Sequence, residues 1–209
     1  MTLDLTTRYA HESDITKIAE IYTQAFPESV EFYFGKNEAK RVQNLMVPSF
    51  LVLKNAGAKF LVFGDPIVGY CCYSVEDNKT GRKTFSSASL GYYWQSLKRK
   101  ELQIHAKEIW KLMRTQYLMK KHYNVDLPKN RGRILSVAIL PEAQSQGIGK
   151  LMLDRALLDI GDKHVVLEVR PENEKAYRLY KSAGFRVKGS TRDLLGCWLI
   201  MVKNPKGES

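Results

Sequence analysis

The sequence predicts an α/β protein with a mixed, mostly antiparallel central sheet flanked by helices. In the second half of the chain, apolar runs of strand length alternate with segments of helical periodicity, as in strands that are joined through helices. In the first half, two apolar runs are separated only by Gly64, Asp65 and Pro66, which predicts a hairpin. No apolar run approaches the roughly 18 residues of a membrane-spanning helix.

In the first half of the chain, the sequence predicts a strand at 5–10, two helices and the hairpin around residues 64–66. A helix over about 15–26 follows from apolar residues at i, i+3, i+4 and i+7, which are Ile15, Ile18, Ala19 and Tyr22. Pro27 is expected to stop it. The elements that follow are a helix at 37–47 and paired strands at 59–63 and 67–75.

The second half predicts the remaining strands and helices of the sheet. In order, these are a strand at 133–140, a helix at 147–161, a strand at 164–170, a helix at 173–183, and strands at 185–190 and 195–202. The chain has no internal repeat and no low-complexity tract. Its 209 residues fit one large domain or a domain with an insertion.

The positive charge belongs to one segment. Residues 95–133 carry eleven Lys and Arg against three acids, which is +8 of the formal net charge of +11. A helix over about 97–122 has an apolar stripe made of Leu102, Ala106, Ile109, Met113 and Tyr117. Two interpretations stay open: an ordinary solvated basic face over a packed stripe, or a helix that binds a membrane surface or a partner. In either case the stripe is expected to be buried against another surface.

Cysteine usage and the N-terminus predict a cytoplasmic protein. Cys71 and Cys72 are adjacent in an expected strand, so they point to opposite faces and do not pair, and Cys197 leaves an odd count. Metal-ligand spacing is absent, and we read the three as small core residues. The first residues lack the basic start and apolar core of a signal peptide.

A turn with two glycines joins the strand at 133–140 to the next helix. It reads Gln144-x-x-Gly147-x-Gly149, and free N–H groups at a helix start favour an anion such as phosphate. It is not a dinucleotide-binding loop, because Met152 stands where the third glycine is needed. Nor is it a P-loop, because Leu151 follows Lys150.

A second motif follows in the helix at 173–183. It is N-x-x-A-x-x-L-Y-x-x-x-G-F, which runs from Asn173 through Tyr180 to Phe185. With the glycine turn, it resembles the GNAT superfamily of N-acetyltransferases. The resemblance is specific over about 133–190, loose over 5–76, and does not cover 80–130. It implies a GNAT fold for residues 1–209 as a single domain, with a basic helical insertion at about 80–130 between the third and fourth strands.

The resemblance implies that acetyl-CoA is the cosubstrate and that no metal is needed. Tyr180 would protonate the departing CoA thiolate, although its place on an apolar helix face also fits simple packing. Asn173 would contact the pantetheine arm, cap the helix, or do both. The remaining cofactor-binding residues lie on the strand, Val137, Ala138 and Ile139, and in the turn, Gln144, Ser145, Gln146, Gly147, Ile148, Gly149 and Lys150.

The general base is assigned through a closer resemblance. Leu167 to Arg170 reads L-E-V-R, as in the RimI-like branch, which acetylates protein N-termini and in which the strand glutamate is the proposed base. This implies that Glu168 is the base. The alternative is a structural ion pair between Glu168 and Arg170, two positions on. Acceptor residues in that branch correspond to about 26–34 and 190–196, and the insertion is expected beside them as a lid or dimer surface.

The expected function is acetyl transfer from acetyl-CoA to a primary amine of a small molecule, an amino acid or a protein N-terminus. The alternatives are a non-catalytic acyl-CoA-binding regulatory domain and a basic nucleic-acid-binding module. The basic segment holds no recognised nucleic-acid motif, so nucleic acid is not the expected partner. We expect no membrane partner and a monomer or homodimer.

Overall fold

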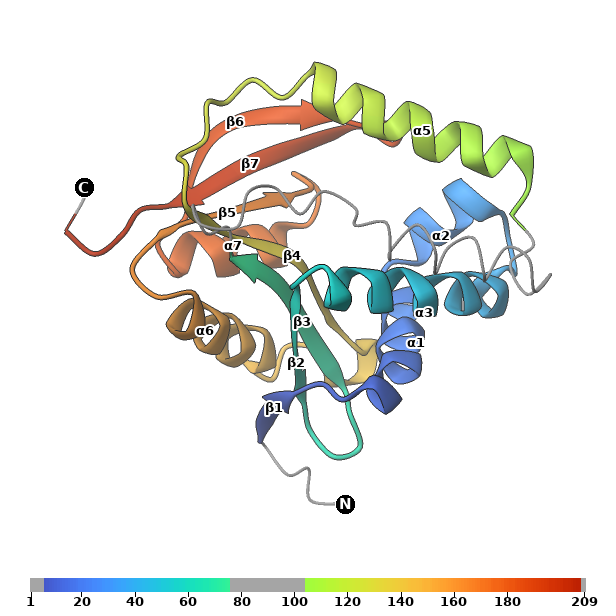
Figure 1. Ribbon diagram of the computed structural model, residues 1–209, viewed down its shortest axis with the longest axis horizontal. Coiled ribbons are helices and arrows are strands. Elements are labelled where there is room, and N and C mark those ends of the chain that lie inside the picture. Colours follow the sequence, from blue (N-terminus) through green and yellow to red (C-terminus); the bar gives the residue numbers. More distant parts are fainter. Residues whose placement is uncertain (1–5, 76–103, 208–209) are drawn as a thin grey trace.

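The computed structural model describes residues 6–75 and 104–207, which form one seven-stranded sheet with helices on both faces (Figure 1). The strand order is β1-β2-β3-β4-β5-β7-β6, and every neighbouring pair is antiparallel except β4 and β5. The strands are β1 (Thr7–Tyr9), β2 (Lys59–Phe63), β3 (Gly69–Val75), β4 (Arg131–Ile139), β5 (His164–Val169), β6 (Arg186–Arg192) and β7 (Cys197–Lys203). This confirms the mixed, mostly antiparallel sheet.

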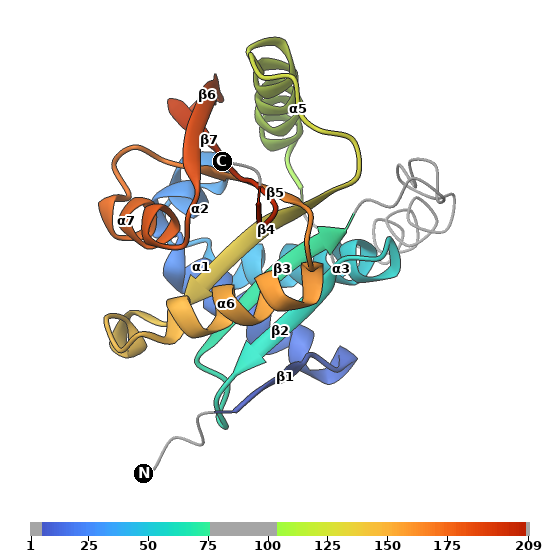
Figure 2. The same cartoon turned by 90° about the vertical axis from the view of Figure 1, so that its left-hand side faces the viewer.

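The helices cover both faces of this sheet. In Figure 2, α6 crosses one face of β2, β3 and β4, while α1 and α3 lie behind the same strands. The helices are α1 (Ile15–Ala25), α2 (Pro27–Phe34), α3 (Ala39–Asn55), α5 (Ala106–Lys121), α6 (Ile148–Ile160) and α7 (Glu174–Ser182), with 3-10 turns η1 (Glu12–Asp14) and η2 (Pro141–Ala143). No helix in the described ranges is long and apolar enough to cross a membrane.

Two prolines lie in helical segments that the sequence did not predict. The first helix does end before Pro27, but Pro27 then begins α2, where its missing N–H leaves no hydrogen bond unmade. Pro48 lies inside α3, which continues to Asn55 instead of ending at 47. Beyond it, Phe50 and Val52 are buried, so core packing holds the last turns of α3.

The central opening of the sheet lies between β4 and β5. The two parallel strands pair only from Arg131 to Arg133 on β4, opposite His164 to Val166 on β5. β4 continues to Ile139 while it stays paired with β3, and β5 continues to Val169 while it stays paired with β7. The facing edges of the two strands therefore separate, and in the described part of the chain this leaves backbone N–H and C=O groups of β4 without a strand partner.

Helix α5 lies between β3 and β4 in the chain, as the predicted insertion does. Residues 80–103 of that insertion lie outside the described residues. α5 runs beside α2 at its start and β6 at its end (Figures 1 and 2). Its expected apolar stripe is not buried: Ile109, Met113 and Tyr117 are exposed, and the buried residues of α5 are Glu108 and Thr115.

Candidate active site

The turn after β4 is open on the side where a ligand would approach. Gly147 is the N-cap of α6 and has φ 79°, a left-handed conformation that favours glycine. A Cβ atom added there would meet nothing within 4 Å. Ser145 is also left-handed, with φ 67°. The Gln144 side chain donates to the carbonyl of Ile139 at 3.2 Å, which ties the turn to the end of β4.

The first turn of α6 has N–H groups that make no helical hydrogen bond. The first helical bond runs from the N–H of Leu151 to the carbonyl of Gly147, so the N–H groups of Ile148, Gly149 and Lys150 precede the helical ladder. Gly147 makes no side-chain cap. These N–H groups and the positive end of the helix dipole suit an anionic ligand.

Gly149 has a different role from Gly147. A Cβ atom at Gly149 would lie 3.3 Å from Cδ1 of Ile139 and 3.4 Å from Cδ2 of Leu179. The absence of a side chain at position 149 therefore lets α6 pack closely against β4 and α7. Lys150 forms an exposed ion pair with Asp154 at 2.6 Å.

Val137, Ala138 and Ile139 lie in the part of β4 that has separated from β5. Their register partners on β3 are Cys71, Tyr70 and Gly69. This stretch leads directly into η2 and the glycine turn. The open strand edge and the open helix start are thus consecutive along the chain.

Glu168 lies on β5, two residues beyond the last residue paired with β4. Its Oε1 atom accepts from Nη2 of Arg133 at 2.7 Å and from the hydroxyl of Tyr123 at 3.1 Å. Within residues 6–75 and 104–207, its Oε2 atom takes no hydrogen bond. The side chain is 10 % exposed. The structure does not contain the alternative Glu168–Arg170 ion pair, because the Arg170 side chain binds Asp193 instead.

Tyr180 lies near the end of α7 and packs edge-on against Phe185, with ring centroids 5.9 Å apart. It is 7 % exposed, and burial raises its pKa above the usual range for tyrosine, with the neighbouring Cys71 thiol as a smaller cause. Cys71 is the register partner of Val137, so Tyr180 lies near the open stretch of β4. Its hydroxyl makes no hydrogen bond to the described residues.

Asn173 caps α7, because its Oδ1 atom accepts from the N–H of Ala176 at 3.1 Å. The cap uses only the side-chain carbonyl. Its amide NH2 group can therefore donate to another partner at the same time.

The sequence did not single out Asp193, whose carboxylate joins three parts of the site. Asp193 lies in the turn between β6 and β7 and is 4 % exposed. Its donors are Nη2 of Arg170 at 2.7 Å, Nε1 of Trp198 at 2.9 Å, the hydroxyl of Tyr33 at 3.4 Å, and the N–H groups of Leu195 at 2.8 Å and Gly196 at 3.0 Å. The carboxylate thus holds the β6–β7 turn against α2, the two regions expected for an acceptor, and also against Arg170 at the end of β5.

Two other residues of this region were also missed, Arg133 and Tyr123, which bind Glu168. No local pattern marks either residue, because each meets Glu168 only through the fold. The described part of the chain holds no group of three His, Cys, Asp or Glu side chains able to bind a metal ion.

A family model identifies the class of protein to which this fold belongs. The model of the acetyltransferase (GNAT) family matches residues 15–185. The match covers most of the chain, so the chain belongs to this family. A search of curated proteins gave no match.

Solved structures share the fold at low sequence identity. A Corynebacterium glutamicum histone acetyltransferase and related acetyltransferase has a TM-score of 0.66 and 17% identity, covering 100% of this chain and 99% of its own. A Sinorhizobium meliloti phosphinothricin acetyltransferase in complex with acetyl-CoA has a TM-score of 0.55 and 19% identity, and the match covers 98% of this chain and 89% of that protein. The Escherichia coli ribosomal-protein-S18-alanine N-acetyltransferase has a TM-score of 0.56 and 15% identity, and the match covers 98% of this chain and 95% of that protein.

Proposed function

We propose that residues 1–209 form a single domain that moves an acetyl group from acetyl-CoA to a primary amine. The observation that carries this proposal is the separation of β4 from β5 directly before an open helix start. One continuous stretch, from Val137 to Lys150, offers first an unpaired strand edge and then unpaired N–H groups. That order suits a ligand with an extended amide-containing arm and a pyrophosphate.

The residues present fit acetyl-CoA. The amide groups of the pantetheine arm would pair with the backbone of Val137, Ala138 and Ile139, as an added strand does. The pyrophosphate would meet the N–H groups from Ser145 to Lys150, with room above Gly147. Gln144 would keep the turn in place through its bond to Ile139. The amide of Asn173 would donate to the arm. Acetyl-CoA is present in the related Sinorhizobium meliloti structure.

Acetyl transfer needs a proton acceptor beside the amine and a donor beside the sulfur. Glu168 would accept the amine proton through its Oε2 atom, while Arg133 and Tyr123 hold Oε1. The amine nitrogen forms a bond to the acetyl carbon as the C–S bond breaks. The hydroxyl of Tyr180 would donate to the departing thiolate, since a tyrosine side chain is ordinarily protonated at neutral pH.

The acceptor would enter between α2 and the β6–β7 turn, which Tyr33 and Asp193 already connect. The L-E-V-R run from Leu167 to Arg170 supports an amino-terminal amine of a peptide, as in the RimI-like branch. Helix α5 borders the same end of the site and carries mostly cations, which supports an acceptor with an acidic group.

An acceptor screen tests the proposal. Purified protein would be incubated with acetyl-CoA and small amines, amino acids, spermidine or amino-terminal peptides, and CoA release and acetylated product would be measured by mass spectrometry. We expect amine-dependent CoA release with at least one class, and better use of acceptors bearing a carboxylate than of spermidine. Tight acetyl-CoA binding with no amine-dependent release would favour the non-catalytic acyl-CoA-binding alternative.

A further inference from the structure

Helix α5 presents large apolar residues to solvent, while the two residues that it buries against the protein are polar. The outward residues are Ile109, Trp110, Met113 and Tyr117, which are 45%, 61%, 68% and 52% exposed. The inward residues Glu108 and Thr115 are only 5% and 7% exposed. This is the reverse of the usual arrangement, in which an amphipathic helix hides its apolar stripe. We call the four outward residues the α5 stripe.

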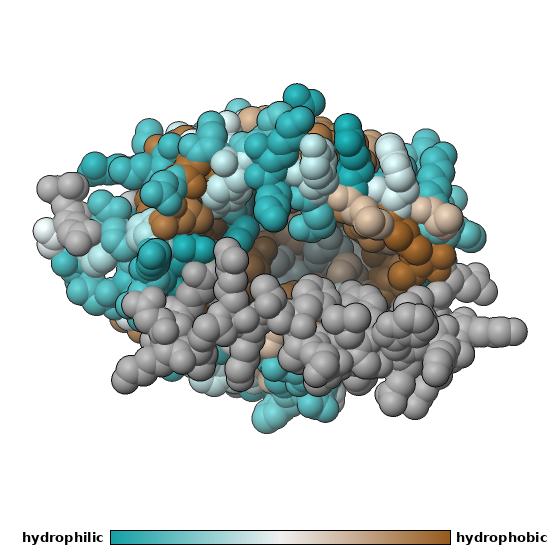
Figure 3. Space-filling view, turned by 45° about the horizontal axis from the view of Figure 1, so that its top comes forward, coloured by the Kyte–Doolittle hydropathy of each residue, from teal (hydrophilic) through white to brown (hydrophobic). Residues whose placement is uncertain are grey.

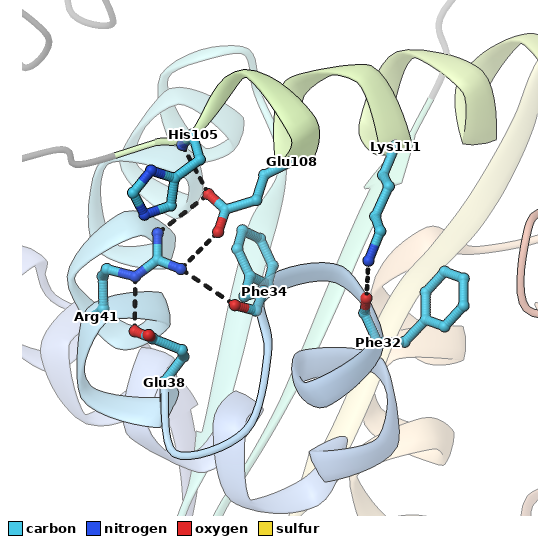
Figure 4. Close-up of polar contacts among 7 residues, drawn as sticks. All are labelled: Phe32, Phe34, Glu38, Arg41, His105, Glu108 and Lys111. Atoms are coloured by element: carbon cyan, nitrogen blue, oxygen red, sulfur yellow. Dashed lines mark hydrogen bonds and ion pairs between the residues drawn. The ribbon is translucent and has the colours of Figure 1, made fainter.

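The start of α5 is fixed in this orientation by ionic contacts (Figure 4). The carboxylate of Glu108 accepts from Nη2 of Arg41 at 2.6 Å and from Nη1 at 3.0 Å, and Arg41 also binds Glu38 at 2.7 Å. Rotating α5 to bury the stripe would strip Glu108 of this partner and would cost Arg41 its two hydrogen bonds to the Glu108 carboxylate. Breaking such a buried pair is strongly unfavourable.

Beyond its first turn, α5 is held by hydrogen bonds to two neighbouring elements, α2 and β6. Thr115 shares a hydrogen bond of 2.7 Å with the hydroxyl of Tyr33 on α2. Lys111 donates to the carbonyl of Phe32 and lies 4.8 Å from the centre of its ring (Figure 4). Near the end of the helix, the hydroxyl of Thr191 on β6 donates to the carbonyl of Met119 at 2.7 Å. These contacts at the middle and the end of α5 keep the stripe, from Ile109 to Tyr117, facing outward.

Cations border the stripe. α5 contains five Lys and Arg, and its only acid, Glu108, faces inward. Four of the cations, Lys107, Arg114, Lys120 and Lys121, are exposed. Arg114 and Lys121 lie 5.4 Å and 5.8 Å from the centre of the Tyr117 ring, so positive charge sits directly beside the stripe. On this side of the molecule, hydrophobic residues lie among hydrophilic ones (Figure 3).

We propose that the α5 stripe binds the surface of an anionic lipid bilayer, with α5 lying along the headgroups. Trp110 and Tyr117 are side chains that suit the boundary between water and lipid, and Met113 and Ile109 would enter the first apolar layer. The exposed cations would meet the anionic headgroups. α5 forms a straight ridge at the edge of the molecule, a shape that suits a flat surface (Figures 1 and 2).

Charge disfavours a second copy of the chain as the occupant. Two α5 helices placed face to face would bring eight exposed cations together, with no exposed acid on either helix to offset them. The inference is independent of the proposed acetyl transfer. It replaces the expectation that the protein has no membrane partner. That expectation rested on the absence of a membrane-spanning run and of a signal peptide, and neither observation concerns binding to a membrane surface.

Vesicle sedimentation tests the inference. Full-length protein would be mixed with vesicles of phosphatidylcholine alone or with phosphatidylglycerol, and the bound fraction measured at low and high salt. We expect binding to the anionic vesicles only, weaker at high salt. Trp110→Ala with Met113→Ala should lower the partition coefficient by about ten-fold or more, as should Lys107→Glu with Arg114→Glu and Lys121→Glu.

Matched controls use exposed residues elsewhere. Leu158→Ala on α6, where Leu158 is 73% exposed, and the triple variant Arg155→Glu, Lys175→Glu and Lys206→Glu should bind like the wild type. Circular dichroism verifies that each variant is folded. Three results would overturn the inference: no vesicle binding, equal losses in the control variants, or a dimer that disappears in the Trp110→Ala and Met113→Ala variant. Binding to polyglutamate that is unchanged by that double variant, without vesicle binding, would assign α5 to an acidic protein instead.

Discussion

Nη2 of Arg133 lies 2.7 Å from Oε1 of Glu168, and this ion pair joins β4 to β5 at the point where the two strands begin to separate. The ion pair and the hydrogen bond from Tyr123 occupy Oε1 of the carboxylate, while Oε2 takes no hydrogen bond from the described residues. Tyr123, from the segment after α5, adds a second hydrogen bond to the occupied oxygen. The proposed base is thus held by groups from β4 and from the insertion.

Replacing Glu168 tests its assignment as the base. Glu168→Gln keeps an oxygen for Arg133 and Tyr123 but removes the proton-accepting carboxylate, so we expect kcat/KM for the amine to fall by about a hundred-fold or more. Steady-state kinetics measure this, with Glu172→Gln, an exposed residue just past β5, as the control. Equal rates for Glu168→Gln and the wild type would place the base elsewhere.

Tyr180→Phe separates the hydroxyl of Tyr180 from its packing role. The ring can still pack on Phe185, so we expect a stable protein. The hydroxyl acts mainly as the thiolate forms, so kcat should drop by about ten-fold while KM for acetyl-CoA changes little. Tyr177→Phe on the same helix is the control, and both variants are measured side by side. A purely structural Tyr180 would give Tyr180→Phe the same kcat as Tyr177→Phe.

Asp193 should matter for both stability and acceptor use. The carboxylate of Asp193 accepts five hydrogen bonds, whereas the amide in Asp193→Asn has only one oxygen that can accept. The free energy of unfolding should therefore fall by about 1–3 kcal/mol. Urea denaturation measures that change. Because the β6–β7 turn would loosen from Tyr33, KM for the amine should rise more than KM for acetyl-CoA. An unchanged ratio of the two KM values would remove the turn from the acceptor site.

The stability contributed by Asp159 should depend on pH. Burial alone would raise the pKa of this carboxyl, but hydrogen bonds from Lys59, Tyr73 and Tyr9 outweigh it and lower the pKa to about 2. An unfolded Asp titrates at about 3.9. A lowered folded pKa stabilises the protein above the unfolded pKa, and this stabilisation is lost as pH falls from about 4 toward 2.

Asp159→Asn should therefore lower the thermal midpoint at pH 7 and lower it progressively less below pH 4. Thermal unfolding of both proteins between pH 7 and pH 3 measures the difference. Asp162→Asn, nearby but outside this group of tyrosines and lysine, is the control. A difference that grows as pH falls would contradict the lowered pKa.

Local patterns predicted the elements whose packing follows from their own sequence. The hairpin of β2 and β3 and the elements from β4 to β7 lie close to their expected ranges, because apolar periodicity and glycine turns mark them. Helix α2 was missed because Pro27 was interpreted only as a stop, although proline also suits the first position of a helix.

Long-range partners account for what could not be predicted. The apolar spacing of α5 indicated a buried stripe, but Arg41, which fixes the orientation of the helix, lies 67 residues before Glu108 in the chain. Glu168 was matched with Arg170 by proximity in sequence, whereas the parallel pairing of β4 and β5 brings Arg133 to it and Asp193 takes Arg170. The sequence located the turn and strand proposed for acetyl-CoA, but it did not indicate that Gly149 serves packing while Gly147 faces open space.

Binding of acetyl-CoA to Gly147→Glu and Gly161→Glu tests the central claim most directly. Both glycines have a positive φ and open space around an added Cβ, and they lie at opposite ends of α6, so the two variants carry the same charge change. Gly161, with ψ −157°, is the more strained position for a side chain, so it is the more demanding control for folding. The account predicts that Gly147→Glu loses acetyl-CoA affinity by about a hundred-fold in calorimetry while Gly161→Glu binds like the wild type, because only position 147 borders the phosphate site. Equal affinities for the two folded variants would contradict the account.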